Sequence, residues 1–109
     1  MKSAKLSDGT RVACLLSTEA QVLDDHVEGY FRHGIELGSE AVIFDVGANI
    51  GVFGIRALQR GPKIQVYAFE PVPTIFACLE QNAKTFAPDR FHVIPCGVSD
   101  QRGEMEFTY

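Results

Sequence analysis

The stretch VIFDVGANIG, residues 42–51, decides the fold. It opens with a short apolar run whose first two residues are β-branched, which is typical of a strand buried on both faces in a parallel sheet. Gly47 and Gly51 then mark a tight turn, and residues 52–60 read as a helix that ends before Gly61 and Pro62. The stretch therefore predicts a strand, a glycine-rich turn and a helix, and ligands bind at such turns in open α/β sheets.

The same alternation continues downstream. Residues 64–69 and 91–94 read as further strands, and residues 73–86 read as a helix between them. After a turn at residues 100–103, the alternating residues 105–109 read as a fourth strand. The order strand–helix–strand–helix–strand predicts right-handed crossovers and a parallel sheet.

The first part of the chain has a different pattern. Asp8-Gly9 lies between two short strand-like runs and predicts a hairpin. An amphipathic helix follows from Thr18 and ends near Gly34, with its acidic residues, Asp24 among them, expected to face water. We expect a single domain over 1–109, in which 1–38 is the hairpin and helix and 39–109 is a ligand-binding βαβαβ half.

Composition restricts the class of protein. The 109 residues are 46% hydrophobic and 22% charged, as in an ordinary globular domain, and the formal charge of −4 disfavours nucleic acid as a partner. Cys14, Cys78 and Cys96 lie far apart and are expected to be free thiols, so no metal site is predicted. Without a signal-peptide core or a membrane-length apolar run, the expected location is the cytoplasm.

Two carboxylates end the first two strands of this sheet. Asp45 closes the first strand, and Glu70 closes the second strand 25 residues later, near the offset at which an acidic residue reaches a ribose. A structural alternative exists for each: Asp45 as a brace of its loop, and Glu70 as a cap of the following helix. Because carboxyl ends of adjacent parallel strands share one edge, the pair favours a nucleoside site.

The kind of nucleoside ligand follows from the turn itself. A dinucleotide site needs G-x-G-x-x-G, but the central position here is Asn49. A carboxylate such as Asp45 is unfavourable beside a pyrophosphate and favourable beside an ammonium. The turn therefore favours S-adenosylmethionine, which carries an ammonium and no phosphate, over NAD.

These residues also resemble a known family. The pattern D-V-G-A-N-x-G, residues 45–51, followed by F-E-P-x-P-x-x-F-x-x-L-x-x-N, residues 69–82, resembles the FkbM family of S-adenosylmethionine-dependent methyltransferases. The likeness runs from about Val42 to Tyr109. It implies a Rossmann-like class I methyltransferase fold and, for the family, O-methylation of hydroxyl groups on secondary metabolites and sugars.

The resemblance also implies roles for single residues. Those lining the methionine end of the cofactor would be Asp45, Gly47, Ala48, Asn49 and Gly51. Glu70 would hold the ribose, Pro71 would lie against the adenine, and the turn with Gly97 and Val98 would close over the adenine edge. For that last turn, simple packing against the sheet remains an equal alternative.

The resemblance further implies a missing part. Relatives continue with strands on the other side of the first strand, so residues 42–44 would become an exposed edge here. The chain is therefore expected to be the N-terminal, cofactor-binding half of the enzyme, inactive alone and needing its C-terminal half or a partner chain. No catalytic residue is assigned. An RNA-base methyltransferase and a non-catalytic cofactor-binding fragment remain as alternatives.

Overall fold

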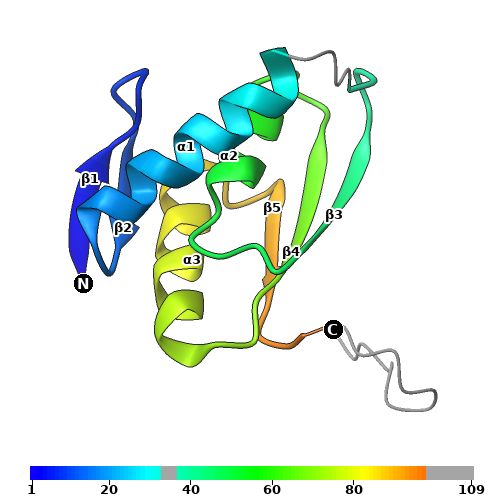
Figure 1. Ribbon diagram of the computed structural model, residues 1–109. Coiled ribbons are helices and arrows are strands. Elements are labelled where there is room, and N and C mark those ends of the chain that lie inside the picture. Colours follow the sequence, from blue (N-terminus) through cyan, green and yellow to red (C-terminus); the bar gives the residue numbers. More distant parts are fainter. Residues whose placement is uncertain (33–36, 98–109) are drawn as a thin grey trace.

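The computed structural model describes residues 1–32 and 37–97, which form a sheet with helices on one side (Figure 1). The sheet is parallel, with the strand order β3-β4-β5. A separate antiparallel hairpin, β1-β2, packs against α1 and α3. In chain order the elements are β1 (Lys2–Lys5), β2 (Arg11–Cys14), α1 (Ser17–Arg32), β3 (Val42–Val46), α2 (Val52–Leu58), β4 (Gln65–Phe69), α3 (Pro73–Phe86) and β5 (Phe91–Ile94).

These elements confirm the predicted order of strands and helices. β5 and α3 have the predicted bounds, β3 runs on to Val46, and α2 ends at Leu58 rather than at residue 60. The hairpin around Asp8-Gly9 is also confirmed, with β1 and β2 antiparallel. The predicted helix end at Gly34 and the predicted strand at 105–109 lie outside the described residues.

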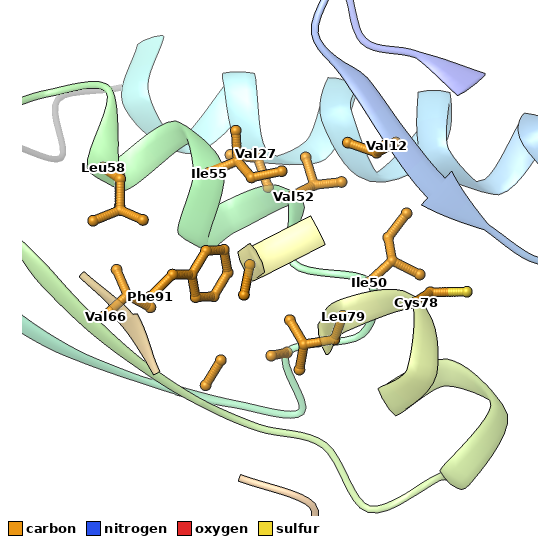
Figure 2. Close-up of a cluster of buried hydrophobic side chains, with 14 of the residues drawn as sticks. Val12, Val27, Ile50, Val52, Ile55, Leu58, Val66, Cys78, Leu79 and Phe91 are labelled. Atoms are coloured by element: carbon orange, nitrogen blue, oxygen red, sulfur yellow. The ribbon is translucent and has the colours of Figure 1, made fainter. Parts of the chain in front are cut away.

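The hydrophobic core fills the space between the sheet and the three helices (Figure 2). Ile55 of α2 and Leu79 of α3 are almost completely buried, as are Val66 of β4 and Phe91 of β5. Burial of a side chain of this size contributes about 1.5–3 kcal/mol. This packing fixes the carboxyl ends of β3, β4 and β5 at one edge of the sheet, next to the starts of α2 and α3.

The other face of the sheet carries no helix from the described part of the chain. Phe44 on β3 is 68% exposed, and its ring lies 5.6 Å from the ring of Tyr67 on β4. Tyr67 in turn stacks on His92 of β5 at 4.6 Å. With Val42 and Val46, these residues form what we call the open face. Within residues 1–32 and 37–97, β3 is an edge strand, as the sequence predicts.

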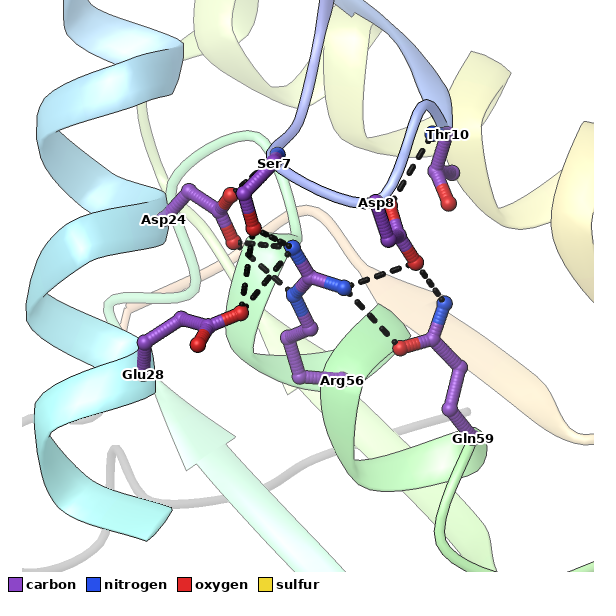
Figure 3. A network of polar contacts seen from close by, with 7 residues as sticks. All are labelled: Ser7, Asp8, Thr10, Asp24, Glu28, Arg56 and Gln59. Atoms are coloured by element: carbon purple, nitrogen blue, oxygen red, sulfur yellow. Dashed lines mark hydrogen bonds and ion pairs between the residues drawn. The ribbon is translucent and has the colours of Figure 1, made fainter. Parts of the chain in front are cut away.

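A buried arginine joins the hairpin, α1 and α2 (Figure 3). Arg56 of α2 donates to Asp24 Oδ1 from Nε at 2.8 Å and from Nη2 at 2.6 Å. The second oxygen of Asp24 accepts the Ser7 N–H at 2.7 Å, and Arg56 also pairs with Asp8 at 2.8 Å. Asp24 is only 2% exposed, so the prediction that this acid faces water is wrong. The reason is the arginine 32 residues away, which neutralises it.

Candidate functional site

The loop after β3 is attached to the end of β4. The N–H groups of Gly47 and Ala48 both donate to the carbonyl of Phe69, at 2.9 and 3.0 Å. β3 and β4 are in parallel register up to Val46 and Phe69, so these bonds extend the ladder into the loop. The two strand ends that carry Asp45 and Glu70 are thus held side by side.

Three loop residues adopt left-handed backbone conformations: Gly47 with φ 71°, Asn49 with φ 57° and Gly51 with φ 98°. At Gly51 a Cβ atom would also lie 2.8 Å from Leu79 Cδ1 and 3.1 Å from the Phe91 ring. A side chain there would therefore be strained and would push α2 away from the core. Glycine at this position therefore permits close packing of α2.

The N–H groups of the loop donate hydrogen bonds to acceptors within the chain. Besides Gly47 and Ala48, Asn49 donates to Glu70 Oε1 at 2.8 Å and Gly51 donates to the Ala48 carbonyl at 3.1 Å. The Ile50 N–H donates to the Asn49 side-chain oxygen at 2.9 Å. All five N–H groups of residues 47–51 are bonded within the chain. A phosphate bound by the turn itself would need these donors free, so residues 47–51 do not form a phosphate cradle.

Glu70 joins the two loops at the edge of the sheet. It is 5% exposed, its Oε1 accepts the Asn49 N–H, and its Oε2 accepts the Val72 N–H at 3.2 Å. The bond to Val72 lies at the start of α3, so the predicted alternative of a helix-capping role is partly correct. A carboxylate has about four acceptor positions, and those not taken by these two bonds leave room for a ligand hydroxyl.

Asp45 lies one residue before the end of β3 and is half-buried. Its Oδ2 atom is buried and has no hydrogen-bond partner among the described residues. Desolvation, helped by the charge of Glu70, raises the pKa of Asp45 from 3.8 to about 6. A buried acceptor without a donor, beside a second carboxylate, suits a cationic ligand group that donates hydrogen bonds. The orphaned oxygen fits the ammonium of S-adenosylmethionine.

The raised pKa of Asp45 has a consequence for stability. Because the folded protein binds a proton more tightly than the unfolded chain, stability is lost as the pH rises from about 4 to about 6. Asp45→Asn removes this penalty, so we expect it to stabilise the ligand-free protein by about 1–2 kcal/mol at neutral pH. Urea unfolding across this pH range measures the effect. A gain of equal size at pH 4 would contradict the argument, and Asp89→Asn on the surface is the control.

The remaining predicted site residues lie around the same edge. A Cβ on Gly97 would lie 3.4 Å from Pro71 Cγ, so the loops after β4 and β5 touch there. The side chain of Ala48 is 6% exposed and belongs to the hydrophobic core, so only its backbone faces the loop. Val98 lies outside the described residues.

Asn82 of α3 supports the site in a way that its sequence context did not reveal. It is 4% exposed and donates to the Ile50 carbonyl at 2.7 Å. It also donates to the Ala13 carbonyl at 3.0 Å and accepts the Ala13 N–H at 2.6 Å. One side chain thereby joins the loop, the hairpin and α3. Its signals in the sequence were its place as the last residue of the motif at 69–82 and its polarity within an otherwise buried helix stripe.

Other kinds of site find no support in the part of the chain that the structure describes. No group of His, Cys, Asp or Glu side chains could hold a metal ion there, and none of its helices could cross a membrane. Cys14, Cys78 and Cys96 are free thiols, as expected.

Comparison with solved structures defines the class. The chain shares its fold with precorrin-6y C5,15-methyltransferase from Geobacter metallireducens, with a TM-score of 0.61 and 20% identity over 90% of this chain and 48% of that one. The hairpin, the three helices and the three parallel strands are an incomplete form of the Rossmann-like class I methyltransferase fold.

Comparison with curated proteins identifies related sequences. No family model matches the chain. It is 39% identical over its full length to 31-O-demethyl-FK506 methyltransferase FkbM from Streptomyces tacrolimicus, of which it covers 43%. It is also 41% identical, over 95% of its length, to 5% of the AMB antimetabolite synthetase AmbE from Pseudomonas aeruginosa. Over its whole length the chain is thus similar in sequence to part of the FkbM methyltransferase, and it spans less than half the length of these two relatives.

Proposed function

We propose that this chain is the cofactor-binding part of an S-adenosylmethionine-dependent methyltransferase that methylates a hydroxyl group of a small molecule, such as a secondary metabolite or a sugar. The observation that carries the proposal is the pair of carboxylates, Asp45 and Glu70, at the ends of adjacent strands. The loop beside them has its N–H groups occupied from Gly47 to Gly51. Such an edge suits a cation and a diol better than a phosphate.

Different residues would bind different parts of the cofactor. Asp45 would accept a hydrogen bond from the α-ammonium, and the loop with Gly47, Ala48, Asn49 and Gly51 would surround the methionine part. An ammonium at Asp45 Oδ2 would satisfy the one buried side-chain atom that lacks a partner in the described chain. This contact would lower the pKa of Asp45, since an opposite charge favours the ionised form.

Glu70 would accept the two ribose hydroxyls, whose charge-assisted hydrogen bonds are stronger than neutral ones. Pro71 and Gly97, which lie close together, would flank the adenine together with Val98. The bonds from Asn49 and Val72 hold the Glu70 carboxylate in place before any ligand arrives. Such preorganisation lowers the cost of binding.

Bound S-adenosylmethionine supplies an electrophilic methyl group. This chain orients the donor, because the loop is held to β4 by the Phe69 carbonyl and to α3 by Asn82. A fixed donor lets the acceptor oxygen approach in line with the breaking bond. None of the described residues is assigned as the base that takes the hydroxyl proton.

The open face points to a further partner. Phe44 is 68% exposed and Val42 is 59% exposed. Both lie on β3, an edge strand with which a further strand could pair. Exposed apolar edges of this kind are unfavourable in isolated proteins. We infer that the remaining half of the enzyme, or a partner chain, adds a strand beside β3 and covers the open face.

Methyl transfer tests this function. The chain alone and the chain joined to the remaining part of the FkbM relative are given labelled S-adenosylmethionine and a panel of alcohols, sugars and RNA. We expect transfer to a hydroxyl of a small molecule by the joined protein and none by the chain alone. Transfer to an RNA base would refute the small-molecule proposal, and inactivity of the joined protein despite cofactor binding would favour a non-catalytic fragment.

A further inference from the structure

An open cleft of about 360 Å³ lies beside the loop, between α1 and α3. Its size is within the range of small-molecule sites. On one side it is lined by the first two turns of α1, and Asn49 and Ile75 line the other side. The α1 residues that line it are Thr18, Glu19, Val22 and Leu23.

We infer that this cleft receives the methyl acceptor, and that it selects alcohols with an apolar body that are neutral or cationic rather than anionic. The inference rests on the proposed function, because it needs a methyl donor on the other side of Asn49. Three features carry it: the position of Asn49, the exposed apolar side of α1, and the charge of Glu19.

Asn49 belongs both to the cleft and to the proposed cofactor loop. Its N–H is held by Glu70 and its side-chain oxygen by the Ile50 N–H, so its position is fixed. Its NH₂ group has no hydrogen-bond partner within the described chain and remains available to a ligand. A molecule in the cleft therefore lies next to the methionine part of the proposed cofactor, as transfer to it requires.

The α1 residues of the cleft are spaced so that they share one side of the helix, at i, i+1, i+4 and i+5. Val22 is 55% exposed, although a large apolar side chain is normally buried by a neighbouring element. With Leu23 and Ile75 it offers an apolar wall within a concave surface. A ligand with an apolar body would bury this wall.

The polar part of the lining determines which ligands fit. Thr18 and Asn49 can bond to a hydroxyl, and Glu19 is the one charged residue among those that line the cleft. No lysine or arginine lines it. A carboxylate or phosphate on the acceptor would meet the Glu19 charge without a compensating cation, whereas an ammonium would be attracted.

Three probes with the same carbon skeleton test this selectivity: tyrosol, tyramine and para-hydroxyphenylacetate, which end in a hydroxyl, an ammonium and a carboxylate. Each is titrated into the isotope-labelled chain with S-adenosylhomocysteine present, and amide shifts are followed. We expect tyrosol and tyramine to shift Leu23, Asn49 and Ile75, and para-hydroxyphenylacetate to bind at least about threefold more weakly than tyramine. Equal binding of tyramine and para-hydroxyphenylacetate would overturn the charge selection.

Two substitutions, each with a control, test whether the probes bind in the cleft. Val22→Trp fills it and is expected to weaken tyrosol binding at least tenfold, while Val42→Trp on the open face leaves tyrosol binding unchanged. Glu19→Gln is expected to reduce the preference for tyramine over para-hydroxyphenylacetate by about two- to fivefold, while Glu80→Gln on the exposed side of α3 does not.

The calorimetric affinity for S-adenosylhomocysteine separates the two proposals. If Val22→Trp lowers that affinity and spares tyrosol, the cleft belongs to the cofactor and the inference is wrong. If tyrosol binds Val22→Trp and the unmodified chain equally, the inference is also wrong. If the unmodified chain does not bind S-adenosylhomocysteine, the proposed function fails, whatever the probes do.

Discussion

Replacing Glu70 by alanine is expected to lower the affinity for S-adenosylhomocysteine by about 100-fold. The variant loses two hydrogen bonds from the ribose to a charged acceptor, and each such bond contributes up to about 1.5–3 kcal/mol. A loss of about 1.4 kcal/mol lowers the affinity tenfold. The bonds to the Asn49 and Val72 N–H groups are lost as well, so the loops are less ordered before binding.

A second variant separates these two contributions. Glu70→Gln keeps an oxygen for the Asn49 N–H but loses the charge, and we expect an affinity loss of about tenfold with a smaller change in thermal stability. Glu80→Gln, which is exposed on α3, is the control and should bind as the unmodified chain does. Calorimetric titration and thermal unfolding of the three variants and the unmodified chain give the comparison. If Glu70→Ala bound the ligand at full affinity, Glu70 would have only the capping role.

The second large effect concerns the buried ion pair. Arg56→Met is expected to lower the free energy of unfolding by about 3–5 kcal/mol, because Asp24 stays 2% exposed without its cation. Arg56 also pairs with Asp8, and its Nη2 lies 3.4 Å from Glu28, so three acids lose one shared partner. The hairpin and α1 would then be less firmly attached to α2.

Urea unfolding of Arg56→Met, Asp24→Asn and the double variant forms a thermodynamic cycle. If the pair acts as described, the double variant is less destabilised than the sum of the single changes, with a coupling of about 1–3 kcal/mol. Arg11→Met, in an exposed position of β2, is the control and should change stability by about 0.5 kcal/mol or less. Equal stability of Arg56→Met and Arg11→Met would refute a structural role for the pair.

The sequence predicts the helices and strands because their signals are local. Apolar runs and glycines at residues 42–51 determine the strand, turn and helix, and Pro73 determines where α3 begins. The edge position of β3 could be predicted from the resemblance, since further strands were expected beside it. The positions of Asp45 and Glu70 at one edge of the sheet could be predicted because both stand at strand ends.

What the sequence does not reveal depends on side chains that meet across the fold. Asp24 was expected in water because nothing near it in the chain suggests Arg56. The bond of the Asn49 N–H depends on the orientation of Glu70, and the amide of Asn82 reaches a residue 69 positions away. Periodicity describes which side of an element is buried, but it does not identify the partner of a buried polar group.

Two carboxylates at neighbouring strand ends, beside a loop with no free N–H group from Gly47 to Gly51, are proposed to bind a nucleoside that carries an ammonium group and no phosphate. Titration of the chain with S-adenosylhomocysteine and, separately, with NAD tests this proposal most directly. We expect one site for S-adenosylhomocysteine, at least tenfold tighter than NAD, with amide shifts at Asp45, Asn49 and Glu70. Tighter binding of NAD, or no binding of S-adenosylhomocysteine, would contradict it.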